Sequence, residues 1–184
     1  MTDAELIRLW RDGNAAAFEA IVARWQQPIA RFLYRYAGVD NGISDLCQEV
    51  FLRLYCSGPR YRENGVFSSW LYRIALNVAR DAGRRNRRPT LSLVNQEIID
   101  RSSGAEDRCQ QQELVGCAAD ALALLPEALR LVLVLRHYEH LSFEDIARLT
   151  GTPASTVKSR FAAALGRMRD QLQQSGWGPE ETTT

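Results

Sequence analysis

The chain has 184 residues, a formal net charge of +1 and 46% hydrophobic residues. This length accommodates one large or two small domains, and the apolar content is sufficient for packed cores. No apolar run is long enough to span a membrane, and the N-terminus, MTDAELIRLW, lacks a cationic segment followed by an apolar one. We therefore expect no membrane insertion, no secretory signal and a cytoplasmic location.

The small net charge conceals two basic segments separated by an acidic one. Residues 80–88 hold five Arg and one Asp, and residues 153–169 hold one Lys and three Arg with no acid. Between them, residues 97–127 hold seven acidic residues and two Arg. Local clusters of cations matter more for phosphate contact than the total charge, so nucleic-acid binding is not excluded. We expect the acidic segment to help the two basic parts close on each other and to shield their cationic faces.

The sequence contains no recognisable pattern of catalytic or metal-binding residues. The candidate metal ligands are Cys47, Cys56, Cys109, Cys117, His137 and His140. The cysteines form no CxxC pair and the histidines lie far from them, whereas a structural zinc site needs closely spaced ligand pairs. No triad-like cluster or glycine-rich phosphate loop occurs. We therefore predict free thiols, no metal, no cofactor and no enzymatic activity.

Helical periodicity, without a convincing strand, predicts an all-α fold. Asn14 is expected to cap a long helix whose apolar stripe runs from Phe18 to Tyr36, and Gly38 is expected to end it. A second helix is predicted over roughly residues 43–56. Its polar face, opposite the apolar stripe, is either solvated or a site for a protein partner.

A third helix is predicted from Phe67 to about Arg85, and it has two distinct faces. Opposite its apolar stripe lies a cationic track of Arg73, Asn77, Arg80, Arg84 and Arg85. Asn can hydrogen-bond a base edge and Arg neutralises phosphate, although a basic helix end is also favoured by the helix macrodipole alone. The aromatic Tyr61 and Trp70 could stack on single-stranded bases, with core packing the favoured role for Trp70.

Pro89 interrupts the helical pattern, and residues 89–109 show neither a clear period nor many large apolar groups. This composition predicts a flexible linker between two small helical domains, at residues 1–88 and 110–176. The tail at residues 177–184 is expected to be disordered. Two domains joined in this way would allow two binding surfaces in one short chain.

Helical periodicity resumes after the linker. The apolar stripe of Leu114, Cys117, Ala121 and Leu124 predicts a helix over residues 110–124. Pro126 is expected to open the next helix, because proline is tolerated in the first turn. The second domain is therefore also helical.

The pattern from Ser142 onward predicts a helix-turn-helix. Ser142 followed by Asp145 resembles a capping box, and Gly151 can enter the left-handed region and end the first helix. Thr152 is predicted as the N-cap of the second helix and Pro153 as its first residue. Its buried positions are expected at Val157, Phe161, Ala164, Leu165 and Met168.

The second of these helices carries hydroxyls and cations on its outer face. These residues are Ser155, Thr156, Lys158, Ser159 and Arg160. Polar and cationic residues near the N-terminus of a second helix, with apolar residues behind them, suit docking in a DNA major groove. A solvated helix hairpin in an ordinary helical domain is the alternative interpretation.

Three strings carry a resemblance to a known family: DLCQEVFLRLY, FSSWLYRIALNVARDAGRR and LPEALRLVLVLRHYEHLSFEDIARLTGTPASTVKSR. They resemble the two modules, region 2 and region 4, of the RNA polymerase sigma factors of the extracytoplasmic-function (ECF) group. The resemblance covers about residues 4–88 and 110–173. The module that lies between them in larger sigma factors is replaced by the linker.

The resemblance implies three binding surfaces. Docking on core RNA polymerase is implied for Asp45, Gln48, Glu49 and Leu52. Recognition of the melted −10 promoter element is implied for Tyr61, Arg62, Trp70, Arg73, Asn77, Arg80, Arg84 and Arg85. Recognition of the −35 element as a duplex is implied for Ser155, Thr156, Lys158, Ser159 and Arg160. Members of the family are typically held inactive by an anti-sigma factor, which is therefore an expected partner alongside core polymerase and promoter DNA.

Two other classes of function compete with this interpretation. A stand-alone helix-turn-helix transcriptional regulator, with a helical sensing or dimerisation domain, explains residues 125–172 equally well. It does not explain the second basic helix or the exposed polar face around Gln48. An enzyme is the weakest alternative.

Departures from the family pattern, Ser155 where Gly is frequent and Phe161 where Leu is usual, bear on promoter preference.

Overall fold

The protein is all-α, as its periodicity predicts. The computed structural model describes residues 1–38, 42–58, 61, 66–85 and 105–177, with the backbone alone at residues 85 and 105–114. The elements within these ranges are α1 (Asp3–Arg11), α2 (Ala15–Ala37), α3 (Ile43–Ser57), α4 (Phe67–Arg85), α5 (Ala105–Leu124), α6 (Glu127–Leu133), the π-helical turn η2 (Val134–Tyr138), α7 (Phe143–Thr150) and α8 (Ala154–Gln174), with no strand among them. The expected linker residues 89–104 and tail residues 178–184 lie outside the description.

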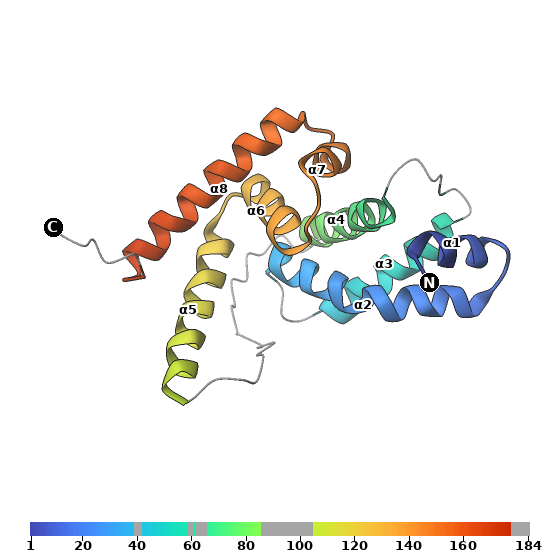
Figure 1. Ribbon diagram of the computed structural model, residues 1–184, viewed down its shortest axis with the longest axis horizontal. Helices are drawn as coiled ribbons and strands as arrows, with labels where there is room; N and C mark the ends of the chain where they lie inside the picture. The colour runs from blue at the N-terminus through green and yellow to red at the C-terminus, as the bar shows by residue number, and fades with distance from the viewer. Residues whose placement is uncertain (39–41, 59–60, 62–65, 86–104, 178–184) are drawn as a thin grey trace.

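Helices α1 to α4 form the N-terminal domain, with α2 as its longest element (Figure 1). The predicted ends of α2 are confirmed, because the Ala17 N–H donates to Asn14 Oδ1 at 3.3 Å and Gly38 adopts a left-handed φ of 64°. Phe32 and Leu71 are fully buried in the core that α2 and α4 share. This packing leaves the opposite side of α4 available for polar residues.

Helix α1 was not predicted, although the sequence contains its signal. Thr2 Oγ1 accepts from the Glu5 N–H at 3.3 Å, and the Thr2 N–H donates to Glu5 Oε2 at 2.7 Å. This reciprocal pair is a capping box, the T-x-x-E signature of a helix N-terminus. Arg24 on α2 then donates to Asp3 Oδ1 at 2.6 Å, which fastens α1 to α2.

Helices α5 to α8 form the C-terminal domain, and Leu135, Ile146 and Val157 are fully buried in it. Helix α5 begins at Ala105, inside the segment expected to be linker. Leu124 was expected on its apolar stripe, but the side chain is 65% exposed. It stands at the C-terminal end of α5, where the chain turns toward α6, so it extends past the surface that α5 packs against.

The helix-turn-helix is confirmed, with two corrections to its second helix. Helix α8 begins at Ala154, and Pro153 occupies the cap position that was expected for Thr152. The Thr152 N–H instead donates to the Ala147 carbonyl at 3.1 Å, so Thr152 still belongs to the turn. Leu165 is 43% exposed rather than buried. It follows the buried Ala164 by one residue, and this step of about 100° carries it to the flank of the apolar stripe.

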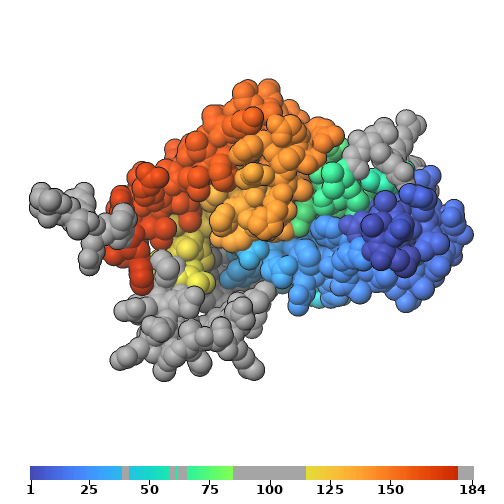
Figure 2. All heavy atoms as spheres, in the orientation of Figure 1, coloured from blue at the N-terminus to red at the C-terminus, as the bar shows by residue number. Residues whose placement is uncertain are grey.

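The two domains pack directly against each other. Helices α2 and α4 of the first domain contact α5, α6, η2 and α7 of the second, and the buried apolar side chains form one continuous cluster. Figures 1 and 2 show the C-terminal domain lying along α2 and α4, with α7 next to α4. Helix α4 therefore has neighbours in both domains.

Two properties of the described residues concern membrane and metal binding. None of the helices described is both long and apolar enough to cross a membrane. Among the described side chains, no three or more His, Cys, Asp or Glu gather in a way that could hold a metal ion. Cys47, Cys56 and Cys117 are free thiols, of which Cys47 is buried, Cys117 half-buried and Cys56 exposed.

Candidate nucleic-acid interface

The N-terminal two turns of α8 present the first candidate surface. Ser142 Oγ accepts from the Asp145 N–H at 3.0 Å and starts α7, and Gly151 ends it with a φ of 66°. The rings of Phe143 and Phe161, 5.6 Å apart, pack α7 against α8. The turn thus fixes the direction in which α8 leaves the domain.

The predicted −35 residues lie together on the outside of α8. Ser155, Lys158 and Ser159 are exposed, and Thr156 and Arg160 are half-buried. Lys158 Nζ lies 3.9 Å from Glu144 Oε1, and the Ser159 hydroxyl donates to the Thr156 carbonyl at 2.9 Å. The Lys158–Glu144 pair is more than half exposed on both sides, so it is weak and leaves the lysine available to a phosphate or base.

The second candidate surface is the polar side of α4. Arg73, Asn77, Arg80 and Arg84 are all exposed there, as the sequence predicts. Arg84 also pairs with Asp81 one turn earlier. The side chain of Arg85 and the whole of Arg62 lie outside the described residues. The four described residues follow one side of α4 for about three turns, which matches the track of a nucleic-acid backbone.

Aromatic rings lie at the start of α4, where the sequence predicts stacking on bases. Tyr61 is only 8% exposed, and its ring centroid is 4.6 Å from that of Trp70 and 6.1 Å from that of Phe67. Trp70 is half-buried. These contacts favour a packing role for Tyr61 in this arrangement, and its contact with DNA stays a prediction.

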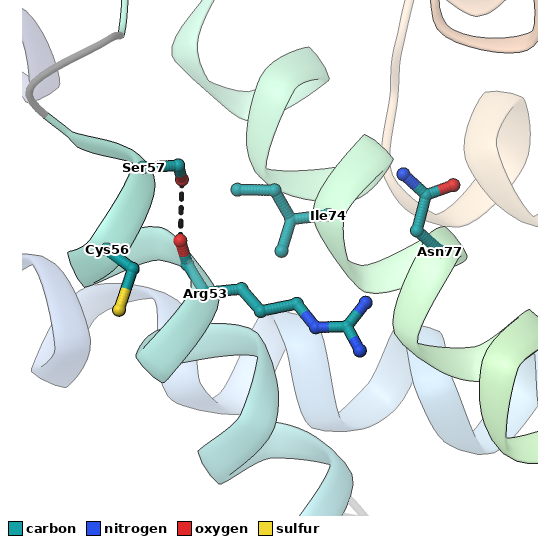
Figure 3. A pocket seen from close by; sticks show the side chains of 5 residues that line it. All are labelled: Arg53, Cys56, Ser57, Ile74 and Asn77. Carbon is teal, nitrogen blue, oxygen red and sulfur yellow. Dashed lines mark hydrogen bonds between the residues drawn. The ribbon is translucent and has the colours of Figure 1, made fainter.

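A pocket opens between α3 and α4, beside the polar track of α4 (Figure 3). Its volume is about 340 Å³, and its lining residues are Arg53, Cys56, Ser57, Ile74 and Asn77. Arg53 crosses the seam between the two helices: its Nε donates to Glu49 Oε1 at 2.7 Å and its Nη1 to Asp81 Oδ2 at 2.9 Å. These hydrogen bonds raise the pKa of Arg53, with Asp81 the stronger partner. Arg53 therefore joins α3 to α4, and Asn77 of α4 lines the pocket between them.

The third candidate surface is the outer face of α3. Asp45 and Gln48 are exposed, Glu49 is half-buried, and Leu52 is 58% exposed. Tyr55, also 58% exposed, continues this face and was not predicted. Its position three residues after Leu52 is the signal that would have found it. Two large apolar side chains beside acidic and amide groups form a surface suited to a protein partner.

Two glutamates of the C-terminal domain reach into the N-terminal domain, and sequence reasoning did not find these contacts. Glu127 Oε1 accepts from the Tyr36 hydroxyl at 2.6 Å and from Arg80 Nε at 3.1 Å. The bond from Tyr36, followed by the weaker contribution of Arg80, lowers the pKa of Glu127. Burial and the Glu127 carboxylate together raise the pKa of Tyr36 to about 12.

The second glutamate is Glu139, just after η2. It accepts from the Tyr72 hydroxyl, and its Oε1 lies 3.7 Å from Arg35 Nη1. Only 6% of its side chain is exposed, and this burial raises its pKa against the opposing effect of Tyr72 and Arg35. A third contact runs from Arg73 Nη2 to the Arg148 carbonyl at 2.6 Å. The polar side of α4 is thus in contact with the C-terminal domain at two of its arginines.

Comparison with known proteins identifies both halves of the chain. Residues 21–89 match the family Sigma-70 region 2, and residues 116–168 match Sigma-70, region 4. The match of the first half removes the stand-alone regulator as an alternative, because a sensing or dimerisation domain is not what residues 21–89 resemble.

Curated relatives match over almost the whole chain. The ECF RNA polymerase sigma-E factor of Haemophilus influenzae is 32% identical over 183 residues, which cover 94% of this chain and 96% of the relative. The RNA polymerase sigma-H factor of Pseudomonas aeruginosa is 32% identical, with 93% and 94% covered. The ECF RNA polymerase sigma-E factor of Escherichia coli K12 is 31% identical, with 94% and 95% covered.

Solved structures share the fold. CnrH, in complex with the cytosolic domain of CnrY, has a TM-score of 0.71 at 22% identity, with 94% of this chain and 97% of CnrH covered. The sigma factor RpoE of Bartonella quintana, in complex with the anti-sigma factor NepR, has a TM-score of 0.65 at 20% identity, with 85% and 96% covered. With two family matches in the expected order and relatives above 30% identity over nearly its full length, the chain belongs to the ECF group of RNA polymerase sigma factors.

Proposed function

We propose that the protein binds core RNA polymerase and directs it to promoters by contacting a −35 element with α8 and a −10 element with α4. The observation that carries this proposal is the presence of two separate polar and cationic helix faces, one in each domain, together with an outward-facing polar and apolar surface on α3. The protein adds no catalytic group of its own and acts in the cytoplasm, where core polymerase works. We assign binding of the polymerase and the −10 element to a domain at about residues 1–88, and binding of the −35 element to a domain at about residues 110–176. Helix α5 extends the second domain back to residue 105.

The two DNA surfaces differ in the form of DNA that they suit. The face of α8 stands at the N-terminus of a helix supported by a turn, which is the geometry that enters a duplex major groove. The face of α4 lies beside an open pocket and next to aromatic rings, and an unpaired base needs such a recess or ring. We therefore assign duplex recognition to α8 and recognition of melted DNA to α4.

The polymerase-binding face is assigned to Asp45, Gln48, Glu49 and Leu52, with Tyr55 added. These residues lie on α3, whose other side packs into the core through Val50 and Leu54. Partner docking on α3 therefore leaves both DNA-binding faces uncovered. An anti-sigma factor is a further proposed partner, since CnrH and RpoE, which share the fold, are complexed with CnrY and NepR respectively.

Run-off transcription with core polymerase and a promoter library tests the proposal. We expect transcripts that depend on this chain and that start downstream of two shared sequence elements. Co-purification with core polymerase is the accompanying binding measurement. A chain that binds promoter fragments alone, but neither co-purifies with core polymerase nor changes its transcripts, would contradict the proposed function.

A further inference from the structure

Three aromatic rings from three different helices meet at the C-terminal end of α3. The ring centroid of Tyr55 lies 6.1 Å from that of Trp10 on α1 and 5.2 Å from that of Phe18 on α2. The centroids of Trp10 and Phe18 are themselves 4.9 Å apart. These separations are those of interacting aromatic pairs, so each ring contacts the other two. The aromatic cluster of Trp10, Phe18 and Tyr55 thus joins the first three helices of the N-terminal domain.

Tyr55 is the exposed member of this cluster. Its side chain is 58% exposed, whereas Trp10 and Phe18 are half-buried. Gln48, Leu52 and Tyr55 are all exposed, and steps of four and three residues place them along one side of α3. The proposed polymerase-binding face therefore ends in a large aromatic side chain that a partner can reach.

The rings that support Tyr55 are confined. A Cβ atom added at Gly58 would overlap the Trp10 ring, so the indole rests directly on the backbone at the end of α3. Helix α1, which carries Trp10, is held to α2 by the hydrogen bond from Arg24 to Asp3 Oδ1 at 2.6 Å. Because Tyr55 packs against rings that cannot easily move, its side chain has less conformational freedom to lose when a partner binds.

We propose that Trp10 and Phe18 are positioning residues for polymerase binding, which hold Tyr55 in place as the aromatic anchor of the α3 face. The inference rests on the proposed function of α3. A few aromatic side chains supply much of the affinity of a protein interface, and those that are ordered before binding lose the least entropy. Helix α1, to which no DNA contact is assigned, then contributes to polymerase affinity through Tyr55.

The affinity of the full chain for core polymerase, measured by fluorescence anisotropy, tests the anchor first. Tyr55→Ala should weaken binding by roughly 10- to 30-fold, which is the loss expected for a residue that dominates an interface. Tyr55→Phe should keep most of the affinity, because the contacts with both supporting rings remain. An unchanged affinity in Tyr55→Ala would overturn the proposal.

Substitution of Trp10 tests the support. Trp10→Leu removes the aromatic contact with Tyr55 and should weaken polymerase binding by roughly 2- to 10-fold, the contribution of an aromatic pair. Trp10→Phe keeps a ring at this position and should restore most of the affinity. Far-UV circular dichroism confirms that both variants remain helical. A leucine variant that binds as tightly as wild type would overturn the role of Trp10.

Ile29→Val is the matched control for a loss of stability alone. Ile29 is fully buried in α2, about three turns from Phe18 on the same helix. The substitution should lower stability in urea unfolding, because it removes a buried methyl group, and leave polymerase affinity unchanged. If Ile29→Val weakens polymerase binding as much as Trp10→Leu does, the effect of Trp10 is one of stability and the proposal is wrong.

A double-mutant cycle distinguishes positioning of Tyr55 from any other effect of Trp10. If Trp10 acts through Tyr55, Trp10→Leu should have little effect on polymerase affinity in a chain that already carries Tyr55→Ala. The same fold-loss in both backgrounds would overturn the proposal, since it would show that Trp10 acts without Tyr55.

Binding of the wild-type chain separates this inference from the proposed function. A wild-type chain that does not bind core polymerase overturns the proposed function, and the inference falls with it. Wild-type binding that Gln48→Lys weakens and Tyr55→Ala leaves unchanged overturns the aromatic anchor alone. Weaker binding by Tyr55→Ala, together with the expected double-mutant cycle, supports the inference as stated.

Discussion

Replacing Gly58 with alanine tests how tightly α1 packs against the C-terminal end of α3, three residues before Tyr61 of the proposed −10 surface. Gly58 has a φ of −52°, which alanine adopts without strain. A Cβ atom at this position would lie 1.9 Å from Cη2 and 2.5 Å from Cζ2 of Trp10. The Trp10 ring cannot move freely, since its centroid is 4.9 Å from that of Phe18 and 6.1 Å from that of Tyr55. The substitution therefore overpacks a filled site.

The magnitude follows from two opposing effects. Overpacking a core costs about 1–3 kcal/mol, while replacing glycine by alanine where the backbone permits it stabilises by about 0.4–1 kcal/mol. We expect Gly58→Ala to lower the free energy of unfolding by a net amount of about 0.5–2 kcal/mol, as measured by urea unfolding followed by circular dichroism. Gly83→Ala is the control, because nothing lies within 4 Å of its added Cβ and α4 continues past it.

The control should change stability in the opposite direction. Alanine at Gly83, in the last turn of α4, is expected to stabilise by at most about 0.5–1 kcal/mol. Trp10→Leu should relieve part of the clash, so its cost should be smaller in the Gly58→Ala background than in wild type. If Gly58→Ala and Gly83→Ala stabilise the protein alike, Trp10 is not held in place and the packing argument is wrong.

Three further predictions concern binding and pH. Gln48→Lys should weaken association with core polymerase in a pull-down titration, because it places a cation on the docking face of α3. Glu19→Gln makes an equal change of charge on α2 and should leave the association unchanged. Equal effects of the two substitutions would remove that face from the mechanism. Arg160→Ala should weaken binding to a duplex −35 element, by roughly 1–3 kcal/mol if the arginine contacts a base, and should spare binding to a pre-melted −10 template. Asn77→Ala should do the reverse. The same defect on both templates would contradict the assignment of two surfaces. The pKa of Glu127 in the folded protein is lowered from 4.5, so its contribution to stability is present above that value and lost as the pH falls through the folded pKa. Glu127→Gln should therefore destabilise most at neutral pH and progressively less below about pH 4.5. A pH-independent difference in urea midpoint between the variant and wild type would refute this.

Local signals predicted most of the helices because each depends on residues close together in the chain. The ends of α2 are marked by Asn14 and Gly38, and those of α7 by Ser142 and Gly151. Each end is set by a hydrogen bond or a backbone angle within a few residues of the cap. The ends of α8 and α5 were placed less well. Pro153 can serve either as a cap or as a first helical residue, and only the path of the turn decides between them.

The contacts between the domains could not be predicted from the sequence. Tyr36 and Glu127 are separated by 91 residues, and Tyr72 and Glu139 by 67. Periodicity assigns Tyr36 to an apolar stripe, and it says nothing about the carboxylate that its hydroxyl meets. The π-helical turn η2 belongs to the same class, because no residue type in its sequence, VLRHY, marks the change in backbone register before Glu139. Sequence patterns thus predicted three polar faces, and they could not reveal that Arg73 and Arg80 of one face contact the other domain.

The two glutamates that reach the N-terminal domain differ in exposure. The side chain of Glu127 is 56% exposed, so its pair with Arg80 is open to water and contributes little to stability. The side chain of Glu139 is 6% exposed, and the contacts with Tyr72 and Arg35 compensate the burial of its carboxylate. Because neither glutamate is a strong source of stability, the packing of the two domains depends mainly on the apolar cluster that they share.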